Sequence, residues 1–232
     1  MADFQLYCLA QSGNAYRAAL MLNLIGADWE PIWVDFSGGA TRKPEYREKV
    51  NEMGEVPVLV HGEKKLTQSG VILIYLSDLT GKFKPANEDE RLEALRWIIF
   101  DNQKVNGFLS PFRLLKNFAK PAGDPAVLAF LKGRAQGNLA IVNKRLTGRQ
   151  FLVSDKPTIA DISMTGYLYY PADEFGFDIS EDYPAIGAWL KRVRGLPGWK
   201  HPYDLMPGYP SELRIERTRC AGVAARPPEE SC

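Results

Sequence analysis

Two short stretches of the sequence carry backbone groups that could bind a ligand, and the first surrounds Pro57. Residues 54–60 are apolar enough to predict a strand, yet proline removes a ladder donor and belongs at strand edges or bends. A cis Val56–Pro57 bond would resolve this conflict, since the cis form of an X–Pro bond costs only about 0.5–1 kcal/mol. We therefore predict a cis bond that exposes the Val56 N–H and C=O, against which an extended ligand could pair as another strand.

The second stretch begins at Gln68-Ser69, where a helix over residues 69–80 is predicted after a short strand. The first N–H groups of a helix have no partner within it, and together with the helix dipole they favour an anion. A backbone clamp beside a helix N-terminus is typical of a site for a small anionic peptide.

A third polar segment, Ser12-Gly13-Asn14, separates a predicted strand at residues 4–9 from a predicted helix at residues 15–24. Serine directly before a helix most often caps it. The segment also offers a hydroxyl group beside a helix N-terminus.

The order of the predicted elements brings these segments into one α/β domain. Strand, helix and strand over residues 4–36 imply parallel pairing with a right-handed crossover. A short helix at residues 44–50 then precedes the proline strand, the strand at Leu66 and the helix from Ser69. This βαβ-α-ββα order is thioredoxin-like, with a mixed four-stranded sheet and helices on both faces.

We predict that the thioredoxin-like domain spans residues 1–82 and that the polar, proline-bearing residues 83–87 form a linker. Residues 88–208 predict an all-α domain, because amphipathic helical patterns recur there without a clear strand pattern. Residues 209–232 have little apolar content and clustered charge, and we predict a disordered tail.

Two polar features stand out in the predicted helical domain. Thr158 and Asp161 have the spacing of a capping box, which is a folding device and not a catalytic pair. The run Asp101-Asn102-Gln103 interrupts an apolar helix, and it faces either the cleft between the domains or water.

Charge and cysteine content exclude several classes of function. A net charge of +1 over 232 residues gives no basic surface for nucleic acid and no polybasic segment for a membrane. No apolar run reaches the ~18 residues of a membrane helix. Cys8, Cys220 and Cys232 have neither C-x-x-C nor metal-ligand spacing, so we predict a cytoplasmic protein without a metal site.

The segments VPVL (residues 56–59) and TQSGVILIYL (residues 67–76) resemble the glutathione-binding half of the cytosolic glutathione transferases. The resemblance covers roughly residues 4–205 and is nearest to bacterial members with a serine-type active site. It implies that the first domain binds glutathione as co-substrate and that the helical domain binds a hydrophobic electrophile. It also implies a homodimer and no metal.

The resemblance implies that Ser12 activates the glutathione sulfur and that Asn14 assists. A free thiol has a pKa of about 8.5, so half-ionisation at pH 7 requires roughly 2 kcal/mol of stabilisation. Two alternatives remain open. Tyr7 lies near the place of the tyrosine used in other branches of the family, although a tyrosine inside a strand is more often a core residue. Cys8 could suggest the cysteine-using branch, but the cysteine of that branch lies at the following turn, nearer Gly13, and a strand cysteine is usually a small buried residue.

For glutathione binding, the resemblance implies that Val56 and Pro57 hold the peptide backbone. Gln68 and Ser69 take the γ-glutamyl end, although glutamine replaces the usual acid and loses a charge pair with the ligand's ammonium group. Lys43, or its neighbour Arg42, is expected to bind the glycine carboxylate. Candidates for the electrophile site are four aromatic residues of the helical domain: Trp97, Phe108, Phe112 and Phe118.

The sequence thus predicts a glutathione transferase that joins the glutathione thiolate to a hydrophobic electrophile. Two alternatives remain: a glutathione-dependent disulfide or peroxide reductase, and a non-catalytic protein that binds glutathione or hydrophobic ligands.

Overall fold

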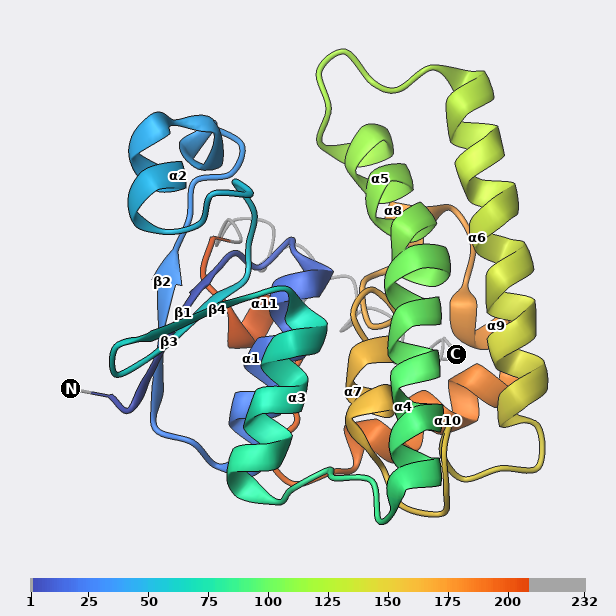
Figure 1. Cartoon of the computed structure of the whole chain (residues 1–232). Helices are drawn as coiled ribbons and strands as arrows, with labels where there is room; N and C mark the ends of the chain where they lie inside the picture. The colour runs from blue at the N-terminus through green and yellow to red at the C-terminus, as the bar shows by residue number, and fades with distance from the viewer. Residues whose placement is uncertain (1, 209–232) are drawn as a thin grey trace, which may run out of the picture.

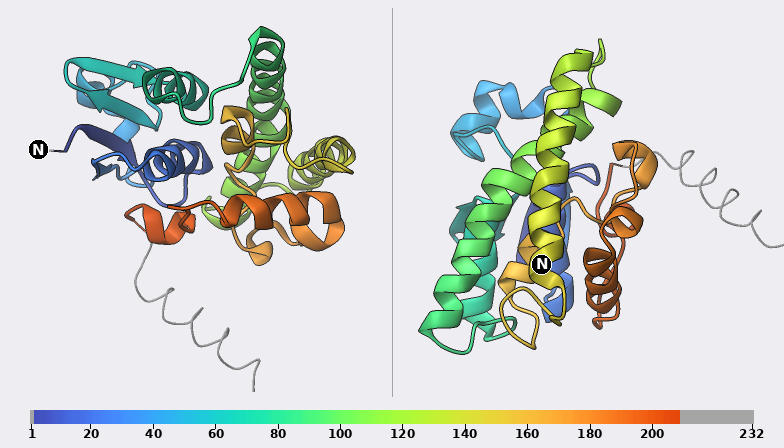
Figure 2. Two further views of the ribbon diagram at one scale, coloured as in Figure 1. Left: turned by 90° about the horizontal axis from the view of Figure 1, so that it is seen from below. Right: turned by 90° about the vertical axis from the view of Figure 1, so that its right-hand side faces the viewer.

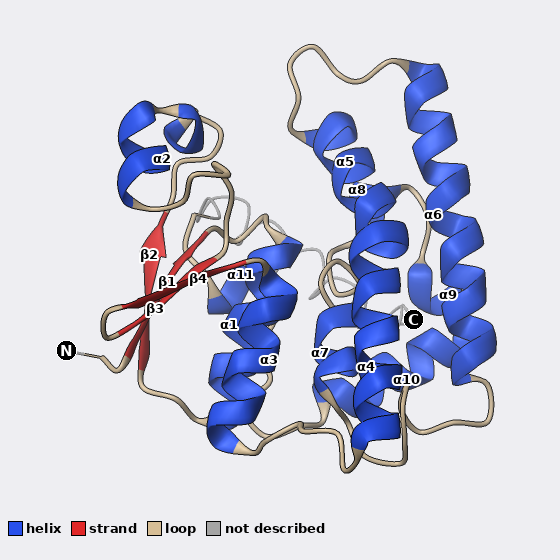
Figure 3. Ribbon diagram, in the orientation of Figure 1, coloured by secondary structure: helices blue, strands red, loops and turns tan. Residues whose placement is uncertain are grey.

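The computed structural model describes residues 2–208 and divides them into an N-terminal α/β domain and a helical domain (Figure 1). The predicted tail at residues 209–232 lies outside the described residues, as do Cys220 and Cys232. Within residues 2–208 the strands are confined to the first domain (Figure 3), as predicted. None of the helices in this part of the chain combines the length and the apolar content needed to cross a membrane.

The N-terminal sheet has the predicted mixed topology, with strand order β2-β1-β3-β4. Strand β1 (Phe4–Cys8) runs parallel to β2 (Trp29–Trp33) and antiparallel to β3 (Val58–His61), which pairs in turn with β4 (Lys64–Thr67). The thioredoxin-like fold is therefore confirmed.

The bond between Val56 and Pro57 is cis, as predicted. The strand that follows it begins only at Val58, whereas the sequence pattern placed Pro57 inside the strand. This difference is consistent with the missing donor of proline, which keeps the residue out of the ladder.

Helix α1 (Gly13–Ile25) lies between the sheet and the helical domain, as the view from below shows (Figure 2). Eleven of its thirteen residues are buried, because it packs against both domains. Ser12 caps its first turn, and Gly26 ends it in the left-handed conformation that glycine adopts without a Cβ clash. Helix α3 (Ser69–Thr80), which starts and ends where predicted, packs beside α1.

The remaining helices of the first domain are short. A 3-10 turn, η1 (Ala40–Arg42), leads into α2 (Pro44–Lys49). Proline in the first turn suits this start, because its missing N–H has no acceptor there in any case.

The helical domain begins with one continuous helical stretch of three parts. Helix α4 (Glu88–Phe100) passes through a π-helical turn, η2 (Asp101–Val105), into α5 (Asn106–Asn117). The irregularity lies where the polar run Asp101-Asn102-Gln103 interrupts the apolar helix.

The rest of the domain packs around this stretch. The long helix α6 (Pro125–Leu146) lies beside α5, and α7 (Ile159–Met164) contacts both α4 and α3. Four further helices follow: α8 (Ala172–Phe175), α9 (Ile179–Asp182), α10 (Pro184–Arg194) and α11 (Pro202–Leu205). The last of them returns to pack on α1, so the chain crosses between the domains twice.

The predicted capping box at the start of α7 is confirmed. Asp161 Oδ2 accepts the backbone N–H of Thr158 at 2.9 Å, and the Thr158 hydroxyl accepts the N–H of Ala160 at 3.3 Å. Asp161 Oδ1 also accepts the N–H of Leu152 and the indole N–H of Trp189, at 3.0 and 2.9 Å. Asp161 therefore joins three segments of the core and is fully buried.

Candidate functional site

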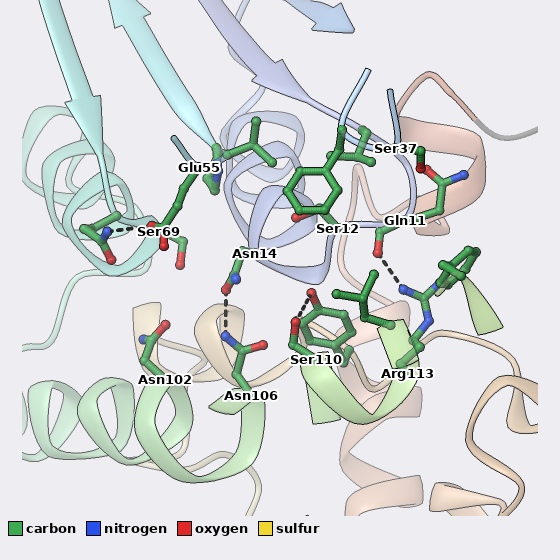
Figure 4. Close-up of a pocket in the computed structure, with 18 of the residues that line it drawn as sticks. Gln11, Ser12, Asn14, Ser37, Glu55, Ser69, Asn102, Asn106, Ser110 and Arg113 are labelled. Carbon is green, nitrogen blue, oxygen red and sulfur yellow. Dashed lines mark hydrogen bonds between the residues drawn. The ribbon is translucent and has the colours of Figure 1, made fainter. Parts of the chain in front are cut away.

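A cavity of about 430 Å³ lies between the two domains (Figure 4). The N-terminal domain contributes twelve residues to its lining: Leu9, Gln11, Ser12, Asn14, Phe36, Ser37, Asn51, Glu55, Val56, Pro57, Gln68 and Ser69. The helical domain contributes seven: Asn102, Asn106, Ser110, Arg113, Leu114, Phe118 and Tyr167. Six of the seven predicted site residues therefore line one cavity.

Lys43 is the exception. It is exposed, it precedes α2 as the cap residue, and it is not among the described residues that line the cavity; the same holds for Arg42. A role of either residue in binding a carboxylate stays a prediction.

Ser12 caps a helix and also has a hydroxyl hydrogen that is available to a ligand. Its Oγ accepts the N–H of Ala15 at 3.1 Å, which is the N-cap expected of serine before a helix. A hydroxyl that accepts this bond keeps its own hydrogen for donation. Because Ser12 lines the cavity, that hydrogen can serve a ligand there.

Asn14, in the first turn of α1, is tied to the helical domain. Its Oδ1 accepts a hydrogen bond from Asn106 Nδ2 at 2.8 Å across the cavity floor (Figure 4). The amide nitrogen of Asn14 is the group left to face a ligand.

The two alternative sulfur-activating residues differ from Ser12 in position. Tyr7 is not among the described residues that line the cavity. Cys8 is fully buried, and burial raises the pKa of its thiol to about 12. At neutral pH this thiol is protonated, and the thiolate is the nucleophilic form.

The loop before β3 is held by polar side chains. Tyr46 Oη and Asn51 Nδ2 both donate to the Glu55 carbonyl, at 2.9 and 3.0 Å. Val56 follows at the cavity wall and precedes the first residue of the strand, so its N–H and C=O are not committed to the sheet.

Gln68 adopts a left-handed backbone conformation, with φ of 63°, that non-glycine residues rarely occupy. Such conformations persist where the surrounding structure enforces them, and they gather at ligand sites. Here it places the Gln68 amide 3.1 Å from the Glu55 carboxylate and opens α3 at Ser69, which is 5% exposed.

Glu55 is an acidic residue of the site that the sequence reasoning missed. It is the one carboxylate among the described residues that line the cavity, and Figure 4 shows its side chain reaching toward Ser69. A signal was present in the sequence: Glu55 directly precedes the backbone clamp at Val56, while an acid is missing at Gln68.

A buried ion pair supports the start of α3 from behind. Arg17 Nη1 lies 2.9 Å from Asp101 Oδ2, and both side chains are almost completely buried. The same nitrogen donates to Asn102 Oδ1 at 2.9 Å and to Ser69 Oγ at 3.4 Å. Burial raises the pKa of Asp101, while Arg17 and the Ser163 hydroxyl lower it. Asp101 therefore faces Arg17 and not water, and Asn102 beside it faces the cavity.

Arg113 holds the turn that precedes Ser12. Its Nη1 donates to the Gln11 carbonyl at 2.5 Å, and its Nε donates to Glu174 Oε2 at 2.6 Å. Its guanidinium also lies 3.9 Å from the ring centre of Tyr170. Glu174 balances the charge of Arg113, which therefore links α5 to α8 and to the turn at Gln11.

The helical wall follows a regular spacing of four residues, since the cavity is lined by residues 102, 106, 110, 114 and 118. Residues four apart share one helix face, which is polar at Asn102 and Asn106 and apolar at Leu114 and Phe118. Phe36 of the first domain completes the apolar end of the cavity.

Of the four aromatic candidates for the electrophile site, Phe118 lines the cavity and the other three do not. Phe112 and Trp97 are core residues, 4% and 3% exposed, and Phe108 stacks edge-on against Phe130 of α6. None of these three falls on the face that repeats every four residues, and a role of any of them in binding the electrophile stays a prediction.

Two family models match the chain: the N-terminal domain of glutathione S-transferase over residues 2–78 and its C-terminal domain over residues 115–197. A solved glutathione S-transferase from Pseudomonas fluorescens is 31% identical, with a TM-score of 0.79 over 87% of this chain and 99% of that one. A disulfide-bond oxidoreductase of Escherichia coli is 27% identical over 195 residues, 81% of this chain and 89% of its own. A glutathione transferase from Burkholderia graminis, solved with two glutathione molecules bound per subunit, is 26% identical, with a TM-score of 0.73 over 85% of each chain.

Proposed function

The chain belongs to the glutathione S-transferase family and is a glutathione transferase, and from this premise we propose that it joins the glutathione thiolate to a hydrophobic electrophile. The observation that supports the proposal is the shared cavity. It unites a backbone clamp, a helix N-terminus, a hydroxyl donor and an apolar end within one space.

In this proposal, the cysteinyl backbone of glutathione pairs with the peptide groups of Val56. The γ-glutamyl carboxylate meets the Ser69 hydroxyl and the first N–H groups of α3, where the helix dipole favours an anion. The Glu55 carboxylate accepts a hydrogen bond from the γ-glutamyl ammonium group. It thereby supplies the negative charge that the neutral Gln68 beside it lacks.

The chemistry requires a thiolate beside the electrophile. Ser12 donates its hydroxyl hydrogen to the sulfur and stabilises the anion, and the thiol proton leaves to water. The sulfur electron pair then forms the carbon–sulfur bond, while the leaving group departs with the electrons of the bond that breaks. Phe36, Leu114 and Phe118 hold the apolar part of the electrophile.

A kinetic comparison tests this assignment. Phe118→Ala and Leu114→Ala should raise KM for electrophiles with a large apolar group and leave glutathione affinity unchanged. Phe130→Ala is the matched control, since Phe130 is an exposed aromatic residue of α6 that does not line the cavity. The proposal would be refuted if both cavity variants conjugated these electrophiles as the wild type does, or if the wild type conjugated no electrophile.

Thiol–disulfide exchange is the second candidate, and the polar half of the helical wall favours it. Asn102, Asn106 and Ser110 give this part of the wall a polar character that suits a peptide-like disulfide better than a hydrocarbon. The bound thiolate would attack one sulfur of the disulfide, form a mixed disulfide and release the other sulfur as a thiolate. An assay with a glutathione mixed disulfide separates the two activities, because conjugation releases no second thiol.

We also propose that the protein forms a homodimer through α3 and α4. Four large apolar side chains on these two helices are about half exposed or more: Val71, Leu79, Leu92 and Ile99. Exposed large apolar groups are typical of association surfaces. Light scattering should give twice the monomer mass, and Ile99→Lys should lower it, whereas a monomeric wild-type protein would contradict the proposal.

A further inference from the structure

One stretch of the helical domain, from Asp101 to Arg113, contacts the start of α1 at three regularly spaced points. Arg113 binds the Gln11 carbonyl, Asn106 binds the Asn14 amide, and Asp101 pairs with Arg17. The contacted positions are 11, 14 and 17: Gln11 lies in the turn before α1, and Asn14 and Arg17 lie in its first turns. The turn that carries Ser12 is therefore held from the other domain along its whole length.

The π-helical turn makes two of these contacts possible together. In an α-helix, residues five apart point about 140° away from each other, because each residue advances by about 100°. In η2, the backbone N–H of Asn106 bonds to the carbonyl of Asp101, five residues earlier. This wider turn brings both side chains to the side of the helix that faces α1. Single π-turns of this kind occur often at functional sites.

The Asn106 amide is held in a defined position. The residue is 8% exposed, and its Nδ2 donates to Asn14 Oδ1 at 2.8 Å. Its own Oδ1 has no hydrogen-bond partner within residues 2–208. The bond to Asn14 is therefore what this buried amide provides to the structure.

The terminal torsion of an asparagine is broad and roughly two-fold, so an unrestrained Asn14 could turn either its oxygen or its nitrogen toward a ligand. An amide oxygen would oppose a thiolate, whereas the NH₂ group would donate to it. Because Asn106 donates to Asn14 Oδ1, the nitrogen is the group presented to the cavity.

We propose that Asn106 is a positioning residue for thiol activation: from the π-turn of the helical domain, it fixes the Asn14 amide so that its NH₂ group faces the glutathione sulfur. The inference rests on the proposed function, in which the sulfur lies beside Ser12 and Asn14. It assigns to the helical domain a part in ionising the thiol, in addition to binding the second substrate.

The test measures the pKa of the bound glutathione thiol from the ultraviolet absorbance of the thiolate against pH. Wild type, Asn106→Ala, Asn14→Ala and the double variant are compared, together with glutathione Kd and thermal stability. Gln103→Ala is the matched control, because it removes an exposed amide from the π-turn that directly precedes Asn106. Asn106→Ser, too short to reach Asn14, serves as the second variant if Asn106→Ala does not fold.

Asn106→Ala should raise the thiol pKa and lower kcat/KM near pH 7 by about two- to tenfold, which is the range of one net neutral hydrogen bond. Glutathione Kd should change by less than about twofold on the same scale. In the Asn14→Ala background, Asn106→Ala should have no further effect on the thiol pKa, and Gln103→Ala should resemble wild type.

Three outcomes would overturn the inference. An Asn106→Ala protein with a wild-type thiol pKa would show that the residue only stabilises the fold, whatever its melting temperature. An equal effect of Asn106→Ala with and without Asn14 would show that it does not act through Asn14. A wild-type protein that fails to bind glutathione would refute the proposed function itself, which is a different result from glutathione binding with an unaffected thiol.

Discussion

Replacing Ser12 by alanine removes two interactions that can be measured separately. The first is the cap on α1, since Ser12 Oγ accepts the N–H of Ala15. Loss of such a cap costs about 0.5–2 kcal/mol of folding stability. The second is the proposed hydrogen bond to the glutathione thiolate, which concerns the ligand and not the fold. Unfolding experiments report the first interaction, and thiol titration reports the second.

The magnitude for the thiolate follows from the charge of the acceptor. A hydrogen bond to a charged group contributes about 1.5–3 kcal/mol, which corresponds to a rise of about one to two in the pKa of the bound thiol. Well below the wild-type thiol pKa, the thiolate fraction and kcat/KM should fall by about ten- to a hundredfold. Above the pKa of the variant both proteins hold the thiolate, so the difference should vanish.

The assay is the pH profile of kcat/KM together with the ultraviolet titration of bound thiol. Ser12→Gly separates the two interactions further, because glycine caps a helix almost as well as serine but lacks the hydroxyl. It should recover stability and not activity, whereas Ser12→Thr should keep both. Tyr7→Phe should behave as wild type, since Tyr7 does not line the cavity. A loss of activity in Tyr7→Phe with a normal Ser12→Ala would refute the assignment, and normal rates in both would leave Asn14 and the helix N-terminus as the activating groups.

Three further predictions concern single side chains. Glu55→Gln should weaken glutathione binding by about tenfold in calorimetry and leave the affinity of an analogue without the α-amino group unchanged; equal losses for both ligands would mean that Glu55 does not meet the ammonium group. Asp161→Ala should cost about 3–5 kcal/mol in urea unfolding, because it leaves buried donors unpaired, against about 1 kcal/mol for Thr158→Ala; equal costs would contradict this. In a variant without Cys220 and Cys232, Cys8 should resist thiol reagents until the protein unfolds, since burial raises its pKa to about 12; rapid labelling of the native protein would show that the thiol is accessible.

The sequence was sufficient for features that depend on neighbouring residues. Helix α3 begins at Ser69 and ends at Gly81 as predicted, because caps and stops are local in sequence. The capping box at Thr158 and the cis bond at Val56–Pro57 are local in the same sense. The thioredoxin-like order followed from the succession of these elements.

The features that the sequence did not predict depend on contacts between the domains. No pattern of residue types marks the π-turn η2 in the sequence. The turn is explained by two contacts with α1, between Asp101 and Arg17 and between Asn106 and Asn14. The aromatic candidates were chosen for residue type, whereas the cavity wall is defined by a spacing of four along one helix face. Phe118 satisfies both criteria and Phe112 satisfies only the first.

The boundary at residues 83–87 separates two patterns of secondary structure, yet it does not separate two independent units of stability. Helix α1 belongs to the first domain by sequence, but its Arg17 is fully buried and pairs with Asp101 of the second. Breaking a buried ion pair by removing one partner costs about 3–5 kcal/mol, because it leaves an uncompensated charge. Without the helical domain, Arg17 would lose Asp101, Asn14 would lose Asn106, and the Gln11 carbonyl would lose Arg113. The turn that carries Ser12 therefore reaches its final geometry only when both domains are folded together, which couples the proposed thiol chemistry to the docking of the helical domain.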